Sequence, residues 1–567
     1  MDQIETVECF FGRVNDFVQA SLDGYQPERH AAGKSFRDAI WGTNRYYPWE
    51  IAILDSPLLQ RLRDIRQTGL AYLVYPTAEH SRFDHTLGMV AVASRIVRSI
   101  NEKHPKQEDP IVNYAQHMAI RVSAILHDVG HSCLSHVSEG TYGSSDEFAS
   151  MKGYINRKFG VNPKPHEIMS WLVVQSPPFK DFIAELGTQG ILTGWECTPE
   201  GVDAIAGNII GYRNNPSEKF VADIINGPMD ADKLDYLVRD AYFAGPTVVY
   251  DLERFLHTVD VVAYPHDTSL PDATGKISRL SIRMEGVTAL EQIIISKLML
   301  FSYMYHHQKI RCVEAMCHEA LERLVALGKR KAQDKVSPWL GHPVAFLRVS
   351  DSTLLPLVWP LQISVRGDKV AGEILTMLAK RKLYKRALII SRLFIEDIDS
   401  PGNEAPRRGF DELLKCSDDR AARESLRQKI FKRAKKLMVS KEWKYRTPAI
   451  RKTFGIHHIC LDVPKAPSVE ETVGVMLPVT RGRSERETQY VPLIDIFPIE
   501  KWVDAYNAIK WRGHVFAIEE AVPFVNTAAR EILAASPFNL RFTSAATALC
   551  KLQLGDLPQA DFRLFSS

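Results

Sequence analysis

Residues 124–131 read AILHDVGH, and this stretch is the most informative part of the chain for its fold and its chemistry. It places His127 and Asp128 side by side at the end of an apolar run with helical spacing. An imidazole and a carboxylate are costly to bury unless a partner or a metal binds them, and both are ligands for divalent cations. His131 follows one helical turn later, where we expect it to face substrate rather than the same ion. The stretch therefore predicts one wall of a metal centre on a helix.

Two distant segments can supply the remaining ligands. The run SRFDHTLG places His85 at the start of a strongly helical segment. The run DADKLDYLVRD is unusually polar for a helix, and Asp232, Tyr236 and Asp240 recur every four residues along one face, with Lys233 beside them. A stripe of two carboxylates and a phenol is not typical of core packing. We therefore expect His85 and Asp232 to complete the centre.

The composition excludes several classes of protein. The chain has 567 residues, which is long enough for more than one domain. Its hydrophobic share of 45% and charged share of 25% are ordinary for a soluble protein, and a net charge of +3 is too small to indicate a nucleic-acid partner by itself. The eight cysteines include no Cys-x-x-Cys pair, which favours reduced thiols. With no apolar run of about 18 residues and no signal-like start, we expect a cytoplasmic protein without a membrane span.

The periodicity of apolar residues predicts a mainly α fold, with a helical core and a smaller C-terminal α+β module. Helices are predicted over 57–70, 86–101, 114–129, 166–175, 219–225, 230–243, 287–325, 421–439 and 498–510. Strands are predicted over 386–391, 458–463 and 474–479. We expect four parts: an N-terminal lead, the helical core, a helical and loop extension, and the α+β module, over residues 1–33, 34–326, 327–440 and 441–567.

His85, the His127-Asp128 step and Asp232 fit the H…HD…D pattern, and the chain resembles the HD-domain deoxynucleoside triphosphate (dNTP) triphosphohydrolase family. The similarity extends through residues 54–67, Arg82-Phe83, residues 127–136 and the run DKLDY. It covers residues 35–325 well and continues more weakly beyond them. Within the family, the match is to mammalian members that join a SAM domain to an HD domain and to bacterial dGTPase-like members. We expect no SAM domain here, because the lead before residue 34 is short.

The resemblance implies an enzyme that cleaves a dNTP into a deoxynucleoside and inorganic triphosphate. It assigns the metal to His85, His127, Asp128 and Asp232, and these residue types do not choose among Fe, Mn, Zn, Co and Mg. It assigns catalysis to His131, His136, Glu139 and His166. His136 is the leading general acid, with Glu139 behind it to fix its tautomer. The family has Asp at position 139.

The resemblance also assigns seven residues to the substrate. Lys297 stands where the family has an arginine, so it keeps the charge and loses the bidentate fork. The implied roles are phosphate contacts for Arg82, Lys233 and Lys297, contacts to the 3′-hydroxyl for Gln67 and Asp240, and packing against the deoxyribose for Tyr236 and Tyr305.

Regulation is implied in the same way. Asp55, Gln60, Arg63 and Arg283 match activator-site residues, and a carboxylate with Arg and Gln suits the edge of guanine. The alternative for Asp55 is a helix cap before a surface helix, and Glu285 reverses the charge of a family lysine. The resemblance implies an activating nucleotide that orders a homo-oligomer, a tetramer or a hexamer, and suggests a role in limiting dNTPs during phage infection. The basic segments could bind such nucleotides or be solvated surface, over residues 329–335, 380–386 and 432–436.

Two other functions stay open from the sequence. The first is another HD chemistry, a nucleotide phosphodiesterase or phosphatase, which needs the metal ligands but not His136, Lys233 and Tyr236 together. The second is a non-catalytic sensor of nucleotides or single-stranded nucleic acid, which the basic segments suggest. A complete metal-ligand set argues against a sensor, because a sensor has no need for four costly ligands. The products formed from a dNTP distinguish these alternatives.

Overall fold

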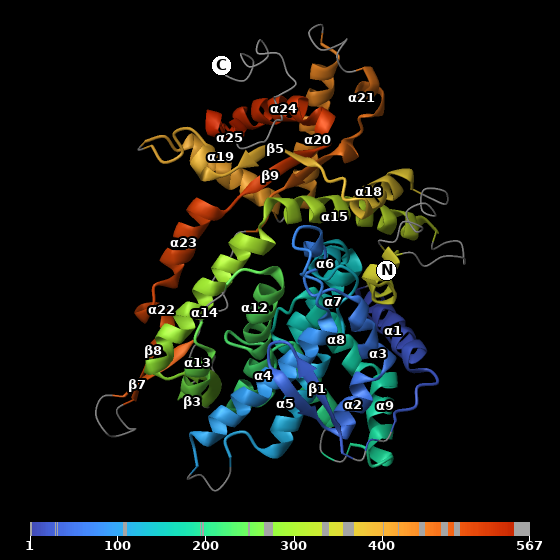
Figure 1. Cartoon of the computed structure of the whole chain (residues 1–567), viewed down its shortest axis with the longest axis vertical. Coiled ribbons are helices and arrows are strands. Elements are labelled where there is room, and N and C mark those ends of the chain that lie inside the picture. Colours follow the sequence, from blue (N-terminus) through green and yellow to red (C-terminus); the bar gives the residue numbers. More distant parts are fainter. Residues whose placement is uncertain are drawn as a thin grey trace. The chain divides into compact units, whose positions relative to one another are not determined.

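The structure is a computed structural model. It describes residues 3–28, 30, 32–105, 110–192, 194, 198–247, 250–265, 276–331, 340–354, 368–400, 402–417, 419–440, 448–465, 475–480 and 488–548. Helices dominate the described residues, and the strands form small antiparallel sheets of two or three strands (Figure 1). This confirms the predicted fold class.

The chain divides into two compact units. The first comprises Met1–Leu300, Leu324–Pro356 and Val469–Pro498, and the second comprises Phe301–Arg323, Leu357–Ser468 and Ile499–Ser567. The boundaries that the sequence suggested after residues 33, 326 and 440 stay predictions, and the last of them borders residues outside the described ranges.

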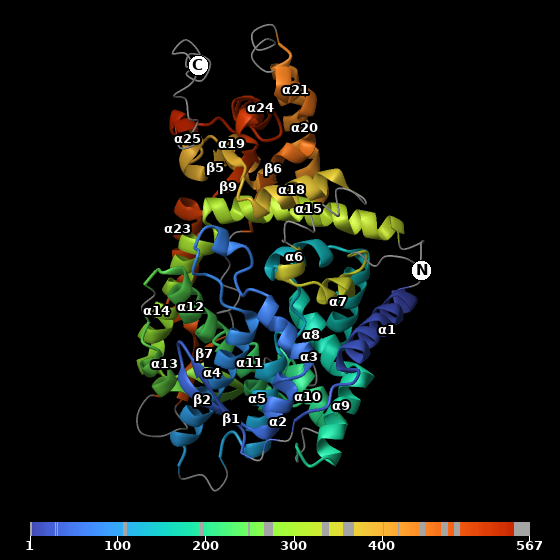
Figure 2. The ribbon, with the colours of Figure 1, turned by 45° about the vertical axis from the view of Figure 1, so that its right-hand side comes forward.

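The long helix α4 (Arg82–Glu102) is central to the first unit. It packs against α5 (Tyr114–Leu126) and α12 (Ala231–Ala244), and all three lie side by side in both views (Figures 1 and 2). α4 begins at Ser81, whose hydroxyl accepts the amide N–H of Asp84 while the Asp84 carboxylate accepts the amide N–H of Ser81. Around this trio lie α8 (Pro165–Gln175) and α11 (Lys219–Ile225), which were predicted, and α10 (Pro199–Ile209), which was not.

Several elements of the first unit were not predicted. The N-terminal lead contains α1 (Gln3–Leu22), whose buried face includes Phe10, Val14 and Phe17 and packs against α7 (Asp146–Phe159) and α9 (Pro177–Thr188). Two hairpins were also missed, namely β1 (Lys34–Asp38) with β2 (Gly42–Tyr46) and β3 (Val259–Pro265) with β4 (Lys276–Ile282).

The predicted helix over residues 57–70 was wrong. Only α3 (Pro57–Gln60) and a 3-10 turn (Arg61–Asp64) form there. The chain then becomes extended, and Arg66 forms an antiparallel bridge with Ser81 at the start of α4. Tertiary pairing with the segment before α4 therefore overrides the local helical pattern.

Shorter elements complete the first unit. They are α2 (Pro48–Leu54), α6 (His136–Tyr142), α13 (Leu252–Thr258), α14 (Val287–Leu300), a 3-10 turn η7 (Pro343–Arg348), α16 (Asp351–Leu354), β7 (Met476–Thr480), β8 (Thr488–Pro492) and α22 (Leu493–Ile496). The strand predicted over 474–479 is β7, although residue 474 lies outside the described residues.

One helical stretch, Met284–Tyr305, is long and apolar enough by length and composition to cross a membrane. Core helices of soluble proteins pass the same test, so this is weak support for a span. Within the first unit, α14 packs against α12 and α13. The single helix predicted over 287–325 is interrupted after α14 by a π-helical turn, η6 (Phe301–Tyr305), which precedes α15 (Gln308–Lys331).

The second unit is built on a three-stranded antiparallel sheet in the order β5-β9-β6. β5 (Lys385–Ile390) and β6 (Ile459–Asp462) match predicted strands, whereas the central β9 (Gly513–Ala517) was not predicted. Its core is apolar and includes Leu388, Val515 and Val525. The helices of this unit include the first part of α15 and α18 (Lys369–Ala379), α19 (Ala405–Leu414), α20 (Arg420–Met438), α21 (Pro448–Thr453), α23 (Ile499–Lys510), α24 (Val522–Ala534) and α25 (Ser544–Ala548).

Candidate metal centre

The His-Asp step lies where α5 ends, and two contacts with α8 fix it. The hydroxyl of Ser170 donates to the backbone oxygen of His127 at 2.6 Å and accepts the amide N–H of Gly130 at 2.8 Å. A β-carbon at position 130 would collide with the backbone of His166 and Ser170. Glycine is therefore needed for α8 to approach the end of α5 so closely.

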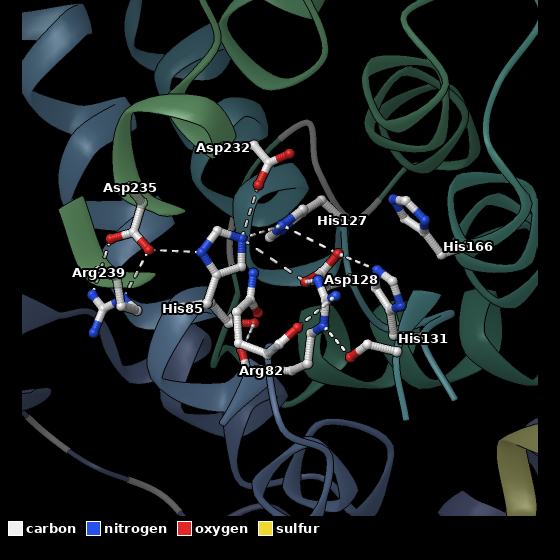
Figure 3. A network of polar contacts seen from close by, with 12 residues as sticks. Arg82, His85, His127, Asp128, His131, His166, Asp232, Asp235 and Arg239 are labelled. Carbon is white, nitrogen blue, oxygen red and sulfur yellow. Dashed lines mark hydrogen bonds and ion pairs between the residues drawn. The ribbon is translucent and has the colours of Figure 1, made fainter. Parts of the chain in front are cut away.

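Two imidazole nitrogens face each other at the centre of the site. The Nε2 atoms of His85 and His127 lie 3.2 Å apart (Figure 3). The other nitrogen of each ring is already engaged, because His85 Nδ1 lies 2.6 Å from Asp235 Oδ2 and His127 Nδ1 lies 2.7 Å from the backbone oxygen of Ala124. If each Nδ1 donates, each Nε2 presents a lone pair, and two lone pairs at this distance repel unless a cation or a proton lies between them.

Two carboxylates approach the same nitrogens. Asp232 Oδ1 lies 3.0 Å from His85 Nε2, and Asp128 Oδ1 lies 3.4 Å from His127 Nε2. Asp128 Oδ2 is 3.9 Å from His85 Nε2. Ligand atoms of His85, His127 and Asp232 all lie within 4.8 Å of one another. Two imidazoles and two carboxylates form a donor set that divalent metals accept, so these residues fit a metal ion.

Asp235 holds His85 from behind. Its carboxylate binds the Arg239 guanidinium at 2.8 Å and also accepts the indole N–H of Trp41. Burial would raise the pKa of Asp235, but the charges and hydrogen bonds of Arg239 and His85 outweigh burial and hold it well below its usual range. A β-carbon at Gly88 of α4 would collide with Asp235 and Arg239. The arrangement is the carboxylate-histidine pairing that commonly orients metal ligands.

The carboxylates also attract positive charge to His85. Burial would lower the pKa of His85, but its hydrogen bonds to Asp232 and Asp235 and their charges raise it to about 10. The ring therefore carries a proton at neutral pH unless a metal replaces it. This is the electrostatic signature expected of a cation site.

Arg82 forms the next side of the site. Its guanidinium donates to Asp128 Oδ2 at 2.7 Å, to the hydroxyl of Ser135 at 3.0 Å and to the backbone oxygen of Gln67 at 3.2 Å. Burial would raise the pKa of Asp128, but the charges of Arg82 and of the nearby histidines hold it well below its usual range. Asp128 therefore stays ionised between Arg82 and the two imidazoles.

A second cluster surrounds one oxygen of Glu139. Its Oε1 lies 2.9 Å from His166 Nδ1 and 3.2 Å from the Nδ1 atoms of His131 and His136. Burial would raise the pKa of Glu139, but the charges of His166 and His136 hold it well below its usual range. Burial would lower the pKa of His166, but Glu139 raises it. His136 has a side chain that is 64% exposed, so it is the member of this cluster that a substrate can reach.

His131 links this cluster to the metal ligands. Its Nε2 lies 3.3 Å from Asp128 Oδ1, and its ring stacks on His166 with centroids 4.0 Å apart and planes 17° apart. Both nitrogens are buried and have no hydrogen-bond partner among the described residues, and burial lowers the pKa of His131 well below its usual value. The ligand atoms of His131, His136, Glu139 and His166 lie within 4.8 Å of one another, so this cluster could also hold a metal ion. Glu139 Oε1 faces the Nδ1 atoms of all three histidines, an arrangement that also suits proton transfer.

A small pocket that is open to solvent lies beside the two clusters. Its lining includes His127, His166, Asp232 and two lysines, Lys164 and Lys233. The Lys233 ammonium donates to Asp230 at 2.6 Å and to the backbone oxygen of Gly227 at 2.8 Å.

Lys297 shares this electrostatic environment. Burial and repulsion by Lys233 and Lys164 lower its pKa to about 7. The pocket itself is lined by Lys164 and Lys233 together with three carboxylates, Glu167, Asp230 and Asp232, so cationic and anionic groups lie close together there.

The structure places only some of the predicted sugar-binding residues near the candidate site. Asp240 is buried and lies 2.7 Å from Nε2 of His80, whose ring stacks on Phe243. Gln67 is buried beside Arg82, and Tyr236 is partly buried on α12. Tyr305 belongs to the second unit, so the structure does not place it at the site.

The predicted activator residues occupy two places in the first unit. Asp55 is the C-cap of α2 and lies 3.3 Å from the ammonium of Lys34. Gln60 accepts from the guanidinium of Arg63 at 2.8 Å. Arg283 instead binds Asp260 of β3 at 2.9 Å. The alternative expected Asp55 to cap the helix that follows it, but Asp55 instead ends α2, and Ser56 is the N-cap of α3.

Sequence reasoning missed five residues that shape the site. Asp235 and Arg239 could have been found, because an acid and a base four residues apart on a helix form a pair. His80 and Asp351 carry no such local signal, since their partners are distant in sequence. Lys164 pairs with nearby Glu167, but that pair does not reveal that Lys164 lines the pocket.

Comparisons with known proteins agree with these observations. A family model described as "HD associated region" matches residues 274–404. An uncharacterized protein of Methanocaldococcus jannaschii is 28% identical over 323 residues, which cover 57% of this chain and 56% of that protein. Deoxynucleoside triphosphate triphosphohydrolase SAMHD1 of Bos taurus is 24% identical over 377 residues, covering 62% of this chain and 58% of that protein. The human SAMHD1 is 23% identical, with 62% and 54% covered.

The chain thus spans little more than half the length of the curated relatives it matches. These similarities support the HD-domain dNTPase-like family that the sequence motifs indicate. Together with the His/Asp cluster, they support a hydrolase of the HD type that binds a divalent metal.

Proposed function

We propose that the protein is a metal-dependent dNTP triphosphohydrolase, which cleaves a dNTP into a deoxynucleoside and inorganic triphosphate. The observation that carries the proposal is the convergence of His85 Nε2, His127 Nε2, Asp128 and Asp232 beside a lysine-lined pocket. The relatives named as dNTP triphosphohydrolases support the choice of substrate.

The four converging residues would hold the metal, and Fe, Mn, Zn, Co and Mg all suit this donor set. A divalent cation there supplies Lewis-acid polarisation of a phosphoryl oxygen or of a bound water. Asp235 keeps His85 oriented, and the Ala124 carbonyl keeps His127 oriented. The two rings therefore lose little freedom when they bind an ion.

Cationic side chains neutralise the triphosphate in this proposal. Lys233 and Lys164 line the pocket, and Lys297 lies close enough for their charges to act on it. Arg82 lies on the other side, with its guanidinium on Asp128. Charge-assisted contacts of this kind bind phosphate oxygens strongly.

The leaving 5′-oxygen needs a proton, and we assign this role to His136. Its Nδ1 faces Glu139, which leaves Nε2 to donate. His166 Nδ1 lies 2.9 Å from Glu139 on another side, and the charges of His166 and His136 keep the carboxylate ionised. The exposure of His136 allows it to meet the substrate, while the other members of the cluster stay buried.

The deoxyribose is recognised separately from the triphosphate in this proposal. We assign the 3′-hydroxyl to Gln67 and Asp240, and the sugar face to Tyr236. Asp240 is already oriented by His80 at 2.7 Å.

We further propose that nucleotides bound at Asp55, Gln60 and Arg63 and, in a second site, at Arg283 activate the enzyme by assembling a homo-oligomer. The pairing of Gln60 with Arg63 next to Asp55 on the chain supports a shared site for those three residues. Assays with each dNTP alone and in pairs, together with sedimentation of the same mixtures, test this. Full activity of a dilute monomer without a second nucleotide would contradict it.

The experiment that tests the main proposal is product analysis. Metal-loaded protein is incubated with the four dNTPs singly and in pairs, and the products are separated by anion-exchange chromatography. We expect nucleoside and inorganic triphosphate in equal amounts, with turnover abolished by His127→Ala and retained by His257→Ala, which alters an exposed histidine on α13. Orthophosphate or pyrophosphate as product would instead identify another HD phosphohydrolase, and nucleic-acid binding without any turnover would identify a sensor.

A further inference from the structure

We propose that Asp351 is a positioning residue that sets the orientation of Arg82 in the candidate site. The proposal rests on the proposed function, in which Arg82 binds the triphosphate. Asp351 begins α16, far along the chain from the metal ligands and within the segment that matches the HD associated region. Through Asp351, the HD associated region would therefore help to orient a residue that binds the substrate.

The side chain of Asp351 binds two backbone segments at once. Its Oδ1 accepts the amide N–H of Leu134 at 2.6 Å, and its Oδ2 accepts the amide N–H of Arg66 at 3.0 Å. The Arg66 guanidinium lies 3.8 Å from the same carboxylate. Asp351 is only 2% exposed, so water does not compete for these bonds.

The first of these segments is in an unfavourable backbone conformation. Leu134 has φ +60° and Ser135 has φ +51°, a region that residues other than glycine rarely adopt. Such a conformation persists only when the surroundings hold it. The Asp351 bond to Leu134 is one restraint, and the bond from the Ser135 hydroxyl to the Arg66 carbonyl at 2.6 Å is another.

The second segment runs beside the start of α4. Arg66 forms a bridge with Ser81, and the amide N–H of Arg82 donates to the carbonyl of Ile65 at 2.8 Å. Fixing the backbone of Arg66 therefore also fixes the backbone from which the Arg82 side chain departs.

Each of the two segments supplies one hydrogen-bond acceptor to the guanidinium of Arg82. Ser135, which accepts from Arg82 Nε, directly follows Leu134, and Gln67, which accepts from its terminal nitrogen, directly follows Arg66. Asp351 thus binds the backbone of Leu134 and Arg66, the residues immediately before these two acceptors. The third acceptor of Arg82 is Asp128, one of the metal ligands proposed above.

A carboxylate is costly at this position, which argues for a functional reason. Burial raises the pKa of Asp351 to about 6, although the two backbone bonds and the charges of Arg66 and Arg82 work in the opposite direction. An asparagine would offer one acceptor instead of two. A buried carboxylate at position 351 can therefore bind both backbone N–H donors at once, which an asparagine cannot do.

The test measures binding of inorganic triphosphate to the full, metal-loaded chain at saturating Mg²⁺ by isothermal titration calorimetry. We expect Asp351→Asn to weaken binding about tenfold while the metal content stays at the wild-type value. In the Arg82→Ala background, Asp351→Asn should cause no further loss, because it acts through Arg82. The neighbouring exposed Ser352→Ala is the matched control and should bind as the wild type does.

Ser135→Ala breaks the same linkage from its other end and leaves Asp351 intact, so it replaces Asp351→Asn if that variant does not fold. Wild-type affinity in both Asp351→Asn and Ser135→Ala would overturn the proposal, and so would an equal loss with and without Arg82. Wild-type protein that binds triphosphate but cleaves no dNTP would contradict the proposed function alone. Wild-type protein that binds no triphosphate would overturn both.

Discussion

Replacing Asp235 by asparagine tests whether His85 is held as a metal ligand. Asp235 Oδ2 lies 2.6 Å from His85 Nδ1, and its two oxygens also accept from Arg239 and Trp41. An asparagine has one acceptor oxygen and one amino group, so at least one of these donors would face another donor. His85 would then lose either its orientation or the charge that makes its Nε2 a stronger base.

The expected loss follows from the type of bond that is removed. A hydrogen bond to a charged group contributes about 1.5–3 kcal/mol, which corresponds to roughly 10- to 100-fold in affinity. Loss of such supporting partners typically weakens metal binding by about the same factor. We therefore expect Asp235→Asn to bind Mn²⁺ at least about tenfold more weakly than the wild type.

The assay is calorimetric titration of metal-free protein with Mn²⁺ at constant pH. Asp38→Asn is the matched control, because Asp38 binds the same Arg239 guanidinium at 2.8 Å and has no hydrogen bond to His85 in the described part of the chain. The reasoning would be refuted if Asp235→Asn bound Mn²⁺ within twofold of the wild type. It would also fail if Asp38→Asn lost as much affinity, since the effect would then come from Arg239.

Four further predictions follow from the charges and packing of the site. Because the pKa of His85 is about 10, metal binding should release about one proton, and the metal affinity should rise about tenfold per pH unit between pH 6 and 8. Calorimetry in buffers of different ionisation enthalpy measures both quantities, and an affinity that does not change with pH would contradict this prediction. Because the pKa of Lys297 is about 7, its charge is lost as pH rises, so KM for a dNTP should rise up to about tenfold from pH 6 to 8. Lys297→Arg should remove this rise, and its persistence would show that another group titrates. Lys164→Gln should raise KM by about 3- to 10-fold with little change in kcat, and an unchanged KM would exclude Lys164 from phosphate binding. Gly130→Ala should lower the free energy of unfolding by about 1–3 kcal/mol through overpacking against α8; an unchanged urea midpoint would disprove the close packing.

The helical core could be predicted because its helices carry strong amphipathic patterns. α4, α5 and α12 each hold apolar residues at three- to four-residue spacing, and α11 was predicted with its observed bounds. β1 (KSFRD) and β2 (GTNRY) contain few of the β-branched residues that mark a strand. β9 has all five residues buried, but five residues are too few to show a period.

The candidate site was predictable to the extent that its chemistry lies in local motifs. His127 and Asp128 are adjacent, and Asp232 lies on a polar helical stripe, so their residue types were informative without a fold. The stacking of His131 on His166 could not be read from the sequence, because it depends on how closely α8 approaches the end of α5 at Gly130.

Sequence separation hides other parts of the site. Asp240 was expected to face the sugar, and its pairing with His80 across 160 positions only emerges in three dimensions. Asp351 is 217 positions from Leu134 and 285 from Arg66, and no periodicity relates residues so far apart. Such contacts depend on tertiary packing rather than on local pattern.

Anomalous X-ray diffraction from crystals of the Mn²⁺-loaded protein tests the central claim most directly, because it locates the ion among its ligands. We expect one strong manganese peak per chain, within about 2.0–2.4 Å of His85 Nε2, His127 Nε2, Asp128 and Asp232. A chain that takes up no manganese, or a peak bound by other residues while His85 and Asp232 stay apart, would contradict the account.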